Sequence, residues 1–429
     1  MKKLLFILTL ALIGSCNYQY DKKDSSVLLK SLNEQYEAHD YFKLKSNFEA
    51  NKERLSKHYL NYYNALLAHV FNQQELSNSY IDLLIDDPEM LENDSLMHRL
   101  YRIKRMNDVN SYEYYDAYNS SAIILKDYKD FEDSSAYDNL LNEQKIWLSL
   151  KDAPIQEVIK KNDTELAMHR DKVGLMNVQC RFEQDSIDFL FDTGANFSVI
   201  KRSLAEELQM KIIDVNFYVT AATGNKVASN IAIASEFYME NILIKNAVFL
   251  VFDDEDISFP QIDYYPNGAI GFPIIEAFEE MHIHNDGRIF IPQNAQHYNY
   301  NNLALEGLMP IIAVYYKKDT LNFNFDTGGS RTTLYHVFYN KYKSEIEAGY
   351  DLEVFESGSG GGNKSFEGFV LDSIKIAIAD KYAIIKDVRL HKNPVYDEIE
   401  SIHGNFGQDF IKQFNTMIIS FKHASVLFE

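Results

Sequence analysis

The sequence predicts a multidomain α plus β fold, in which an α-helical domain precedes a mostly β region made of two related lobes. Between Gly14 and Gly174 there is no glycine, and apolar residues recur there at helical spacing. After about residue 166 glycine returns and apolar residues alternate with polar ones, as in strands. Two segments of that region, QDSIDFLFDTGANFSVI (184–200) and KDTLNFNFDTGGSRTTL (318–334), align without a gap and indicate an internal duplication.

Composition limits the classes of function. The chain has 429 residues, of which 46% are hydrophobic, so it has room for roughly two or three domains with buried cores. The formal net charge is −21, which argues against nucleic acid as a partner. We interpret this charge as a well-solvated acidic surface.

Residues 1–16 have the pattern of an export signal. MKK supplies positive charge, and LLFILTLALI is an apolar core too short to span a bilayer permanently. The IGSC that follows resembles a bacterial lipobox, which implies cleavage before Cys16 and acylation of its thiol. An ordinary signal peptide with an incidental cysteine is the alternative. Acyl chains on Cys16 would make the chain an exported lipoprotein anchored in the outer membrane, facing either the periplasm or the cell surface.

Residues 17–165 are predicted to form the helical domain. Helical apolar spacing is clear in YLNYYNALLAHVF (59–71), SLMHRLYRI (95–103) and YDNLLNEQKIWLSL (137–150). Asp, Asn and Ser between such runs suit helix caps. We expect about seven helices of roughly 10–16 residues. Consecutive pairs could stack as α-hairpin repeats, although the tetratricopeptide signature of Trp, Gly and Pro is missing. Such a domain offers a surface for a protein partner.

The second cysteine, Cys180, lies in the predicted strand GLMNVQCRF (174–182). With Cys16 acylated, it has no partner for an intramolecular disulfide. A thiol nucleophile needs a histidine beside it, and the sequence nominates none. We therefore expect Cys180 to be a buried structural residue.

The duplicated unit continues beyond the aligned segments. Asp192 and Asp326 each follow an apolar strand, and each opens an Asp-Thr-Gly turn. A second glycine element comes later in each unit, in GAIGFPIIEAF (268–278) and GNFGQDFIKQF (404–414). We therefore predict two lobes that arose from one unit, residues 166–297 and residues 298–429.

These motifs resemble those of the pepsin and retroviral-protease clan of aspartic peptidases, over about residues 170–429. The second elements are Ala269-Ile270-Gly271 and Asn405-Phe406-Gly407, where Asn405 replaces an apolar residue. The resemblance implies a single-chain, bilobal, retropepsin-like or pepsin-like fold with a pseudo-twofold axis, each lobe giving one aspartate to the floor of a cleft. It also implies that Thr193 and Thr327 hydrogen-bond across the lobe interface.

A pair of carboxyl groups suits the hydrolysis of a peptide bond. Two carboxylates about 3 Å apart cannot both ionise, so Asp192 and Asp326 would share a proton. The ionised member takes a proton from a water that attacks the substrate carbonyl, and the protonated member donates one; either aspartate can hold the proton. Gly194 and Gly328 let the backbone turn sharply and bring N–H groups near the carboxylates. This chemistry requires no metal or organic cofactor, and the paired histidines of HIHNDG (282–287) have no third ligand nearby.

The third residue after each aspartate affects acidity. Pepsin-like enzymes usually carry serine there, whereas this chain has Ala195 and Gly329. Without a hydroxyl donor to the ionised form, we expect the pair to be less acidic than in pepsin. The expected optimum for cleavage is therefore mildly acidic to neutral.

Two predicted hairpin tips are candidates for flaps over the substrate. AATGNKVAS (221–229) contains Thr223 and Gly224, and GSGGGNKS (358–365) contains Gly358 and Gly360. Mobile lids are the favoured interpretation. Surface hairpins that never touch substrate are the alternative, and the lack of a GK[ST] ending argues against a phosphate loop.

The sequence therefore predicts a lipid-anchored aspartic endopeptidase that hydrolyses peptide bonds of a polypeptide bound as an added strand. One alternative is a non-catalytic peptide-binding module that retains the fold, although keeping two costly acids argues against it. In another alternative the helical domain carries the main function, as a protein-interaction scaffold. In a third, residues 25–165 cover the cleft as an inhibitory segment.

Overall fold

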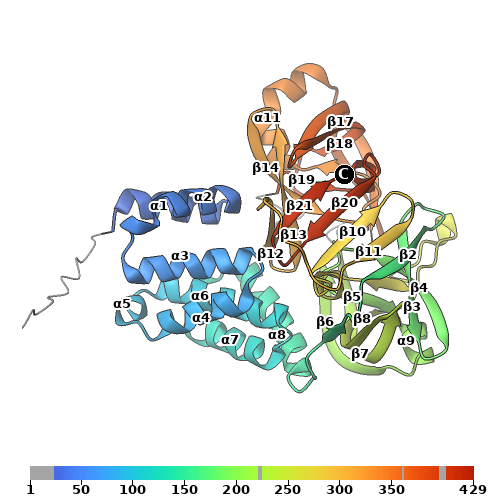
Figure 1. Cartoon of the computed structure of the whole chain (residues 1–429), viewed down its shortest axis with the longest axis horizontal. Helices are drawn as coiled ribbons and strands as arrows, with labels where there is room; N and C mark the ends of the chain where they lie inside the picture. The colour runs from blue at the N-terminus through green and yellow to red at the C-terminus, as the bar shows by residue number, and fades with distance from the viewer. Residues whose placement is uncertain (1–23, 221–224, 360–361, 396–401) are drawn as a thin grey trace, which may run out of the picture.

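The computed structural model describes residues 24–220, 225–359, 362–395 and 402–429. A helical region comes first and a largely β region follows, which confirms the predicted order (Figure 1). The predicted export signal with Cys16 lies outside the described residues, as do Thr223, Gly224 and Gly360. No helix in the described part of the chain is both long and apolar enough to cross a membrane.

Seven helices of 11 to 17 residues form most of the helical region that the structure describes. Their bounds are α1 (Ser26–Glu37), α2 (Tyr41–Asn51), α3 (Lys57–Val70), α4 (Gln74–Ile85), α6 (Asp94–Asn110), α7 (Tyr114–Asp127) and α8 (Ser134–Leu150). A single turn, α5 (Pro88–Leu91), and two 3₁₀ turns, Lys52–Arg54 and Lys129–Phe131, lie between them. Consecutive helices pack together, α3 on α4, α6 on α7 and α7 on α8. Helical structure ends at Leu150, ahead of the predicted boundary at residue 165.

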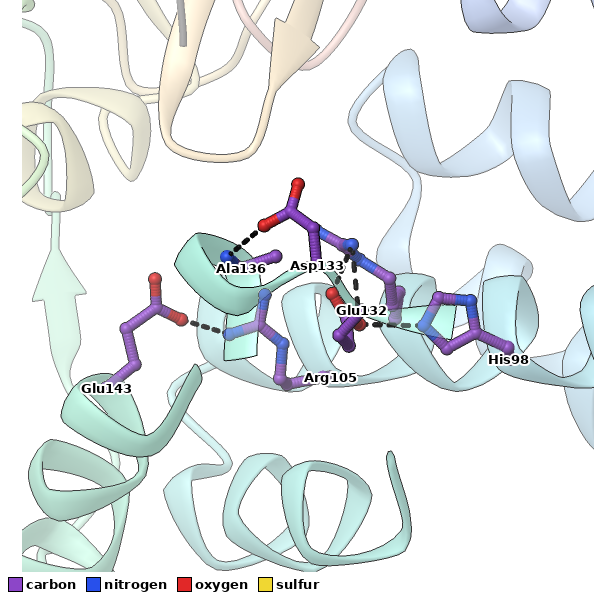
Figure 2. A network of polar contacts seen from close by, with 7 residues as sticks. His98, Arg105, Glu132, Asp133, Ala136 and Glu143 are labelled. Carbon is purple, nitrogen blue, oxygen red and sulfur yellow. Dashed lines mark hydrogen bonds and ion pairs between the residues drawn. The ribbon is translucent and has the colours of Figure 1, made fainter. Parts of the chain in front are cut away.

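Polar contacts hold the connection between α7 and α8 against α6 (Figure 2). His98 Nε2 lies 2.7 Å from Glu132 Oε1, and Arg102 Nη1 lies 3.1 Å from Glu132 Oε2. The hydrogen bond with His98 lowers the pKa of Glu132, so this covered carboxyl stays charged. Asp133 then caps α8 by accepting a hydrogen bond of 2.8 Å from the Ala136 N–H.

The β region begins before the predicted boundary and contains two sheets with short helices between strands. Its first half comprises β1 (Glu157–Ile159), β2 (Thr164–Arg170), β3 (Met176–Phe182), β4 (Asp185–Phe191), β5 (Ser198–Lys201), α9 (Arg202–Glu207), β6 (Lys211–Thr220), β7 (Lys226–Met239), β8 (Ile242–Phe252), β9 (Gly268–Ile270), α10 (Phe272–Glu276), β10 (Glu280–His284) and β11 (Arg288–Ile291). Its second half comprises β12 (Leu303–Glu306), β13 (Met309–Tyr316), β14 (Asp319–Phe325), β15 (Thr333–Leu334), α11 (His336–Gly349), β16 (Glu353–Ser359), β17 (Gly362–Ile378), β18 (Lys381–His391), β19 (Gly404–Phe406), α12 (Gln408–Ile411), β20 (Thr416–Ser420) and β21 (Ser425–Phe428).

The strands of the aligned segments occupy corresponding places in the two sheets. The first sheet contains the order β3-β4-β9-β5-β8-β7-β6, and the second contains β13-β14-β19-β15-β18-β17-β16. In both, the strand before Asp-Thr-Gly pairs in parallel with the short strand before the second glycine: Phe191 lies opposite Ile270, and Phe325 lies opposite Phe406. Antiparallel pairing of β10 with β20 joins the halves.

The helical region packs on both halves of the β region. One apolar cluster joins α6, α7 and α8 to β6, β7 and β8, and includes Trp147. A second cluster joins helices α1–α4 and α6 to Ala304 of β12 and Ile311 of β13. Beside it, His39 Nδ1 lies 2.5 Å from Glu306 Oε2, and the Tyr41 hydroxyl donates to the same oxygen. The helices are therefore fixed to the β region by apolar packing and by a partly buried polar contact.

Candidate active site

Two equivalent strands bring Asp192 and Asp326 to one place. Phe191 and Phe325, the last residues of β4 and β14, are buried in the core. The aspartate is the next residue after each of them. In both turns the aspartate N–H donates to a carbonyl of the neighbouring short strand, at 3.0 Å and 3.1 Å. These hydrogen bonds to the sheet therefore fix the backbone position of each aspartate.

Thr193 and Thr327 join the two turns by reciprocal hydrogen bonds. The Thr193 N–H donates to Thr327 Oγ1 at 3.0 Å, and the Thr327 N–H donates to Thr193 Oγ1 at 3.0 Å. Each hydroxyl donates in turn to the opposite strand, Thr193 to the Phe325 carbonyl and Thr327 to the Phe191 carbonyl. Both threonines are fully buried, so these bonds are not weakened by water.

Gly194 and Gly328 each lie against the carboxyl group of the opposite turn. A Cβ at Gly194 would stand 2.8 Å from Asp326 Oδ1, and one at Gly328 would stand 2.4 Å from Asp192 Cγ. Both distances are shorter than non-bonded contact allows, so a side chain at either position would push the turns apart.

The carboxyl groups of Asp192 and Asp326 hydrogen-bond to each other. Burial, followed by the charge of Asp326, raises the pKa of Asp192 to about 8. Burial also raises the pKa of Asp326, but this carboxylate has a side-chain donor that Asp192 lacks. Asn405 Nδ2 donates to Asp326 Oδ2 at 2.8 Å, and the Gly329 N–H donates to Oδ1 at 2.8 Å. These two donors favour the charged form of Asp326 and leave Asp192 as the better holder of a shared proton, although Asp192 also accepts the Gly194 N–H at 2.9 Å.

Asn405 is a site residue that sequence reasoning missed. The sequence presented it as an irregularity at a position where the other unit has Ala269. In the structure it lies on β19, beside β14, and supplies a donor to Asp326. The absence of a hydroxyl at Ala195 and Gly329 was the available signal, because an ionised carboxylate without that donor needs another one.

The other predicted site residues have different locations. Gly358 lies in β16 opposite Asn363 of β17, and the remaining predicted flap residues are outside the described residues. Cys180 is fully buried in β3, and burial raises the pKa of its thiol. Across the described ranges, no group of three or more His, Cys, Asp or Glu side chains is arranged to hold a metal ion.

Comparison with known proteins agrees with this geometry in the first half. The family model of the aspartyl proteases matches residues 178–273, which include the Asp192 turn and the Gly271 element. These residues therefore form an aspartyl protease-like domain. No curated protein matches the chain.

Proposed function

We propose that this chain is an aspartic endopeptidase in which Asp192 and Asp326 form the catalytic pair. The observation that carries the proposal is the pair of hydrogen-bonded carboxyl groups held between turns that Thr193 and Thr327 link reciprocally. The aspartyl protease-like domain at 178–273 supports a polypeptide substrate. The corresponding strand orders support the view that residues 166–297 and 298–429 are two lobes of one protease fold.

The asymmetric hydrogen bonding supports the following roles in the proposed reaction. Asp326, charged, takes a proton from a water whose oxygen attacks the carbonyl carbon of the scissile bond. Asp192 donates its proton to the carbonyl oxygen, which gives a neutral diol. The proton on Asp326 then passes to the leaving nitrogen, a diol hydroxyl returns a proton to Asp192, and the C–N bond breaks. Both carboxyl groups finish in their starting states.

The same assignment fixes the expected pH dependence. Cleavage requires one proton on the pair. Because the pKa of Asp192 is about 8, activity should fall as pH rises through about 8. Activity should also fall in acid as Asp326 becomes protonated, at a pH above the ordinary carboxyl pKa because burial raises its pKa. The expected profile is a bell centred in the mildly acidic to neutral range.

The test uses the soluble chain from residue 17, which omits Cys16, with a diverse peptide pool between pH 3 and 9. Cleavage is followed by mass spectrometry beside Asp192→Asn and Asp326→Asn. Asp185→Asn is the matched control, since Asp185 is exposed on the strand that leads to Asp192. We expect each catalytic variant to lose at least about 10³-fold in rate and the control to lose none. Cleavage that survives both catalytic substitutions, or a profile peaking below about pH 3, would contradict the proposal.

The proposed location is a membrane surface, reached through a lipid on Cys16 after export. The helical region would then carry the protease at that surface and offer a site for a protein partner. The tip of the first catalytic turn, Gly194, is exposed although the helices are in place. This exposure favours a supporting role for the helices over an inhibitory plug.

A further inference from the structure

Corresponding rows of residues run across the two sheets beside the catalytic turns. Each row crosses three adjacent strands, so its side chains share one face of the sheet. In the first half the row is Ala269, Val199 and Leu250, and in the second half it is Asn405, Thr333 and Arg389. The second row starts at the residue that donates to Asp326.

In the first half the helical region covers this face. Val199 and Leu250 belong to the apolar cluster that the helices complete. Phe197, two residues before Val199, packs against Trp147 with ring centroids 6.2 Å apart, and Tyr114 stacks on Trp147 at 5.9 Å. The chain itself therefore fills the first-half face.

In the second half the equivalent face is polar and accessible. Arg331, at the position of Phe197, is exposed, and Thr333 and Arg389 are partly exposed. The Arg389 Nη1 donates to the Glu356 carbonyl at 2.7 Å, and its guanidinium lies 5.3 Å from the centroid of the Phe355 ring. Among the described residues, neither arginine pairs with a carboxylate.

Both arginines lie within reach of a substrate at the catalytic pair. Adjacent strands are about 4.8 Å apart, so Arg389 lies roughly 10 Å from Asn405. The backbone of Arg331 packs on Gly407, where a Cβ would stand 2.3 Å from the Arg331 carbonyl carbon. Gly407 is two residues from Asn405, which contacts Asp326. Two cations without a partner carboxylate therefore flank the active site of a chain whose net charge is −21.

We propose that Arg331 and Arg389 select peptides with an acidic side chain near the scissile bond. This inference rests on the proposed function and adds the substrate class to it. A guanidinium pairs with a carboxylate through two parallel hydrogen bonds, which amide side chains cannot match. Arg389 is already oriented by a carbonyl and a ring, so less side-chain entropy is lost when it binds a substrate carboxylate. The equivalent face of the first half cannot select an acidic side chain in this way, because Trp147 and its neighbours cover it.

The test compares peptides that differ only in Glu or Gln at each position on either side of the cleaved bond. We expect kcat/KM to favour Glu by about ten-fold at one or two positions, less so at high salt. Arg331→Phe and Arg389→Leu introduce the first-half residues, and the double variant should reduce the ratio to near one through slower cleavage of the Glu peptide. Lys386→Leu, which removes an exposed cation from the same strand, should keep the parent ratio.

Binding separates this inference from the proposed function. The Asp192→Asn protein should bind the Glu peptide about ten-fold more tightly than the Gln peptide in fluorescence anisotropy, even without cleavage. If the parent chain cleaves neither peptide but still binds the Glu peptide more tightly than the Gln peptide, the proposed peptidase activity is rejected and the preference for acidic peptides is retained. Equal binding of both peptides, or a preference that survives the double variant, would overturn the inference.

Discussion

At the scale of single residues, one amide makes the two carboxyl groups of the candidate site unequal. Asn405 donates to Asp326, whereas the corresponding residue, Ala269, offers Asp192 nothing. A donor to the ionised form lowers a carboxyl pKa, so the proton of the pair remains on Asp192. In the proposed reaction Asp192 therefore acts as the acid and Asp326 as the base, because the two halves differ at this one position.

Replacing Asn405 with alanine tests this asymmetry. Loss of the donor removes a hydrogen bond to the charged form, so the pKa of Asp326 should rise. The acidic limb of the kcat/KM profile should move to higher pH while the alkaline limb, set by Asp192, stays near its position. An unchanged profile together with a lower unfolding temperature would assign Asn405 a packing role instead.

At the scale of elements, the two strand–turn units brace each other. Neither turn is satisfied alone, because the N–H of each threonine is paired with a hydroxyl from the other half. Both threonines are fully buried, so an unpaired N–H at either one costs stability. The geometry of the carboxyl groups consequently depends on both halves being assembled.

Thr327→Val is the sharpest test of the brace, since valine has nearly the same shape but no hydroxyl. It leaves the Thr193 N–H and the Phe191 carbonyl without partners. We expect a loss of about 1–3 kcal/mol in the free energy of unfolding, measured by urea denaturation, and a matching loss of cleavage. Thr327→Ser keeps the hydroxyl and should retain most of both. Equal behaviour of the two variants would show that the hydroxyl is unimportant.

At the scale of the whole molecule, the helical region is part of the same folded unit as the protease-like region. Its apolar clusters with β6–β8 and with β12–β13 are buried on both sides. A chain truncated to begin near residue 166 would expose these faces to water, and exposed apolar patches of this kind cause aggregation. We therefore expect truncation to change folding as well as access to the candidate site.

The contact between His39 and Glu306 makes this junction sensitive to pH. Burial opposes a charge on His39, but the hydrogen bond and charge of Glu306 outweigh it and raise the pKa of His39. Burial likewise opposes a charge on Glu306, but His39 lowers its pKa. The raised histidine pKa adds stability that is complete below about pH 6.5 and is lost as pH rises through the folded value. The lowered glutamate pKa adds stability that is present above about pH 4.3 and is lost in more acidic solution.

We therefore expect the parent chain to lose about 1 kcal/mol of stability between pH 6 and pH 8 that Glu306→Gln does not lose. Urea unfolding followed by fluorescence suits this measurement, because Trp147 is the single tryptophan and lies at the junction. His297→Gln, at an exposed histidine, should behave like the parent. Identical pH dependence of stability in the parent and Glu306→Gln would show that the contact between His39 and Glu306 does not cause it.

Sequence alone predicted the parts of the molecule that depend on neighbours along the chain. Helical spacing and the lack of glycine predicted the helical region, and the structure confirms it. The aligned segments predicted that Asp192 and Asp326 each follow an apolar strand, and in the structure both strands end in buried residues, Phe191 and Phe325. The bounds were less accurate, since the helices stop at Leu150 and β1 already pairs with β8. Strand pairing with a distant partner overrides local composition at such an edge.

Relations between distant residues were decided by the tertiary structure alone. The donor to Asp326 lies 79 residues further along the chain, and its role depends on β19 pairing with β14. Asn322, on the polar face of its strand, is buried because its amide donates to the His39 carbonyl, 283 residues away. The filling of one half by Trp147 and the openness of the other depend equally on where the helices dock. Sequence by itself determined local geometry and the two carboxyl groups, since periodicity and turn chemistry act over a few residues. Only the tertiary structure decided which carboxyl is charged and which half is open, because hydrogen bonds and packing depend on proximity in space.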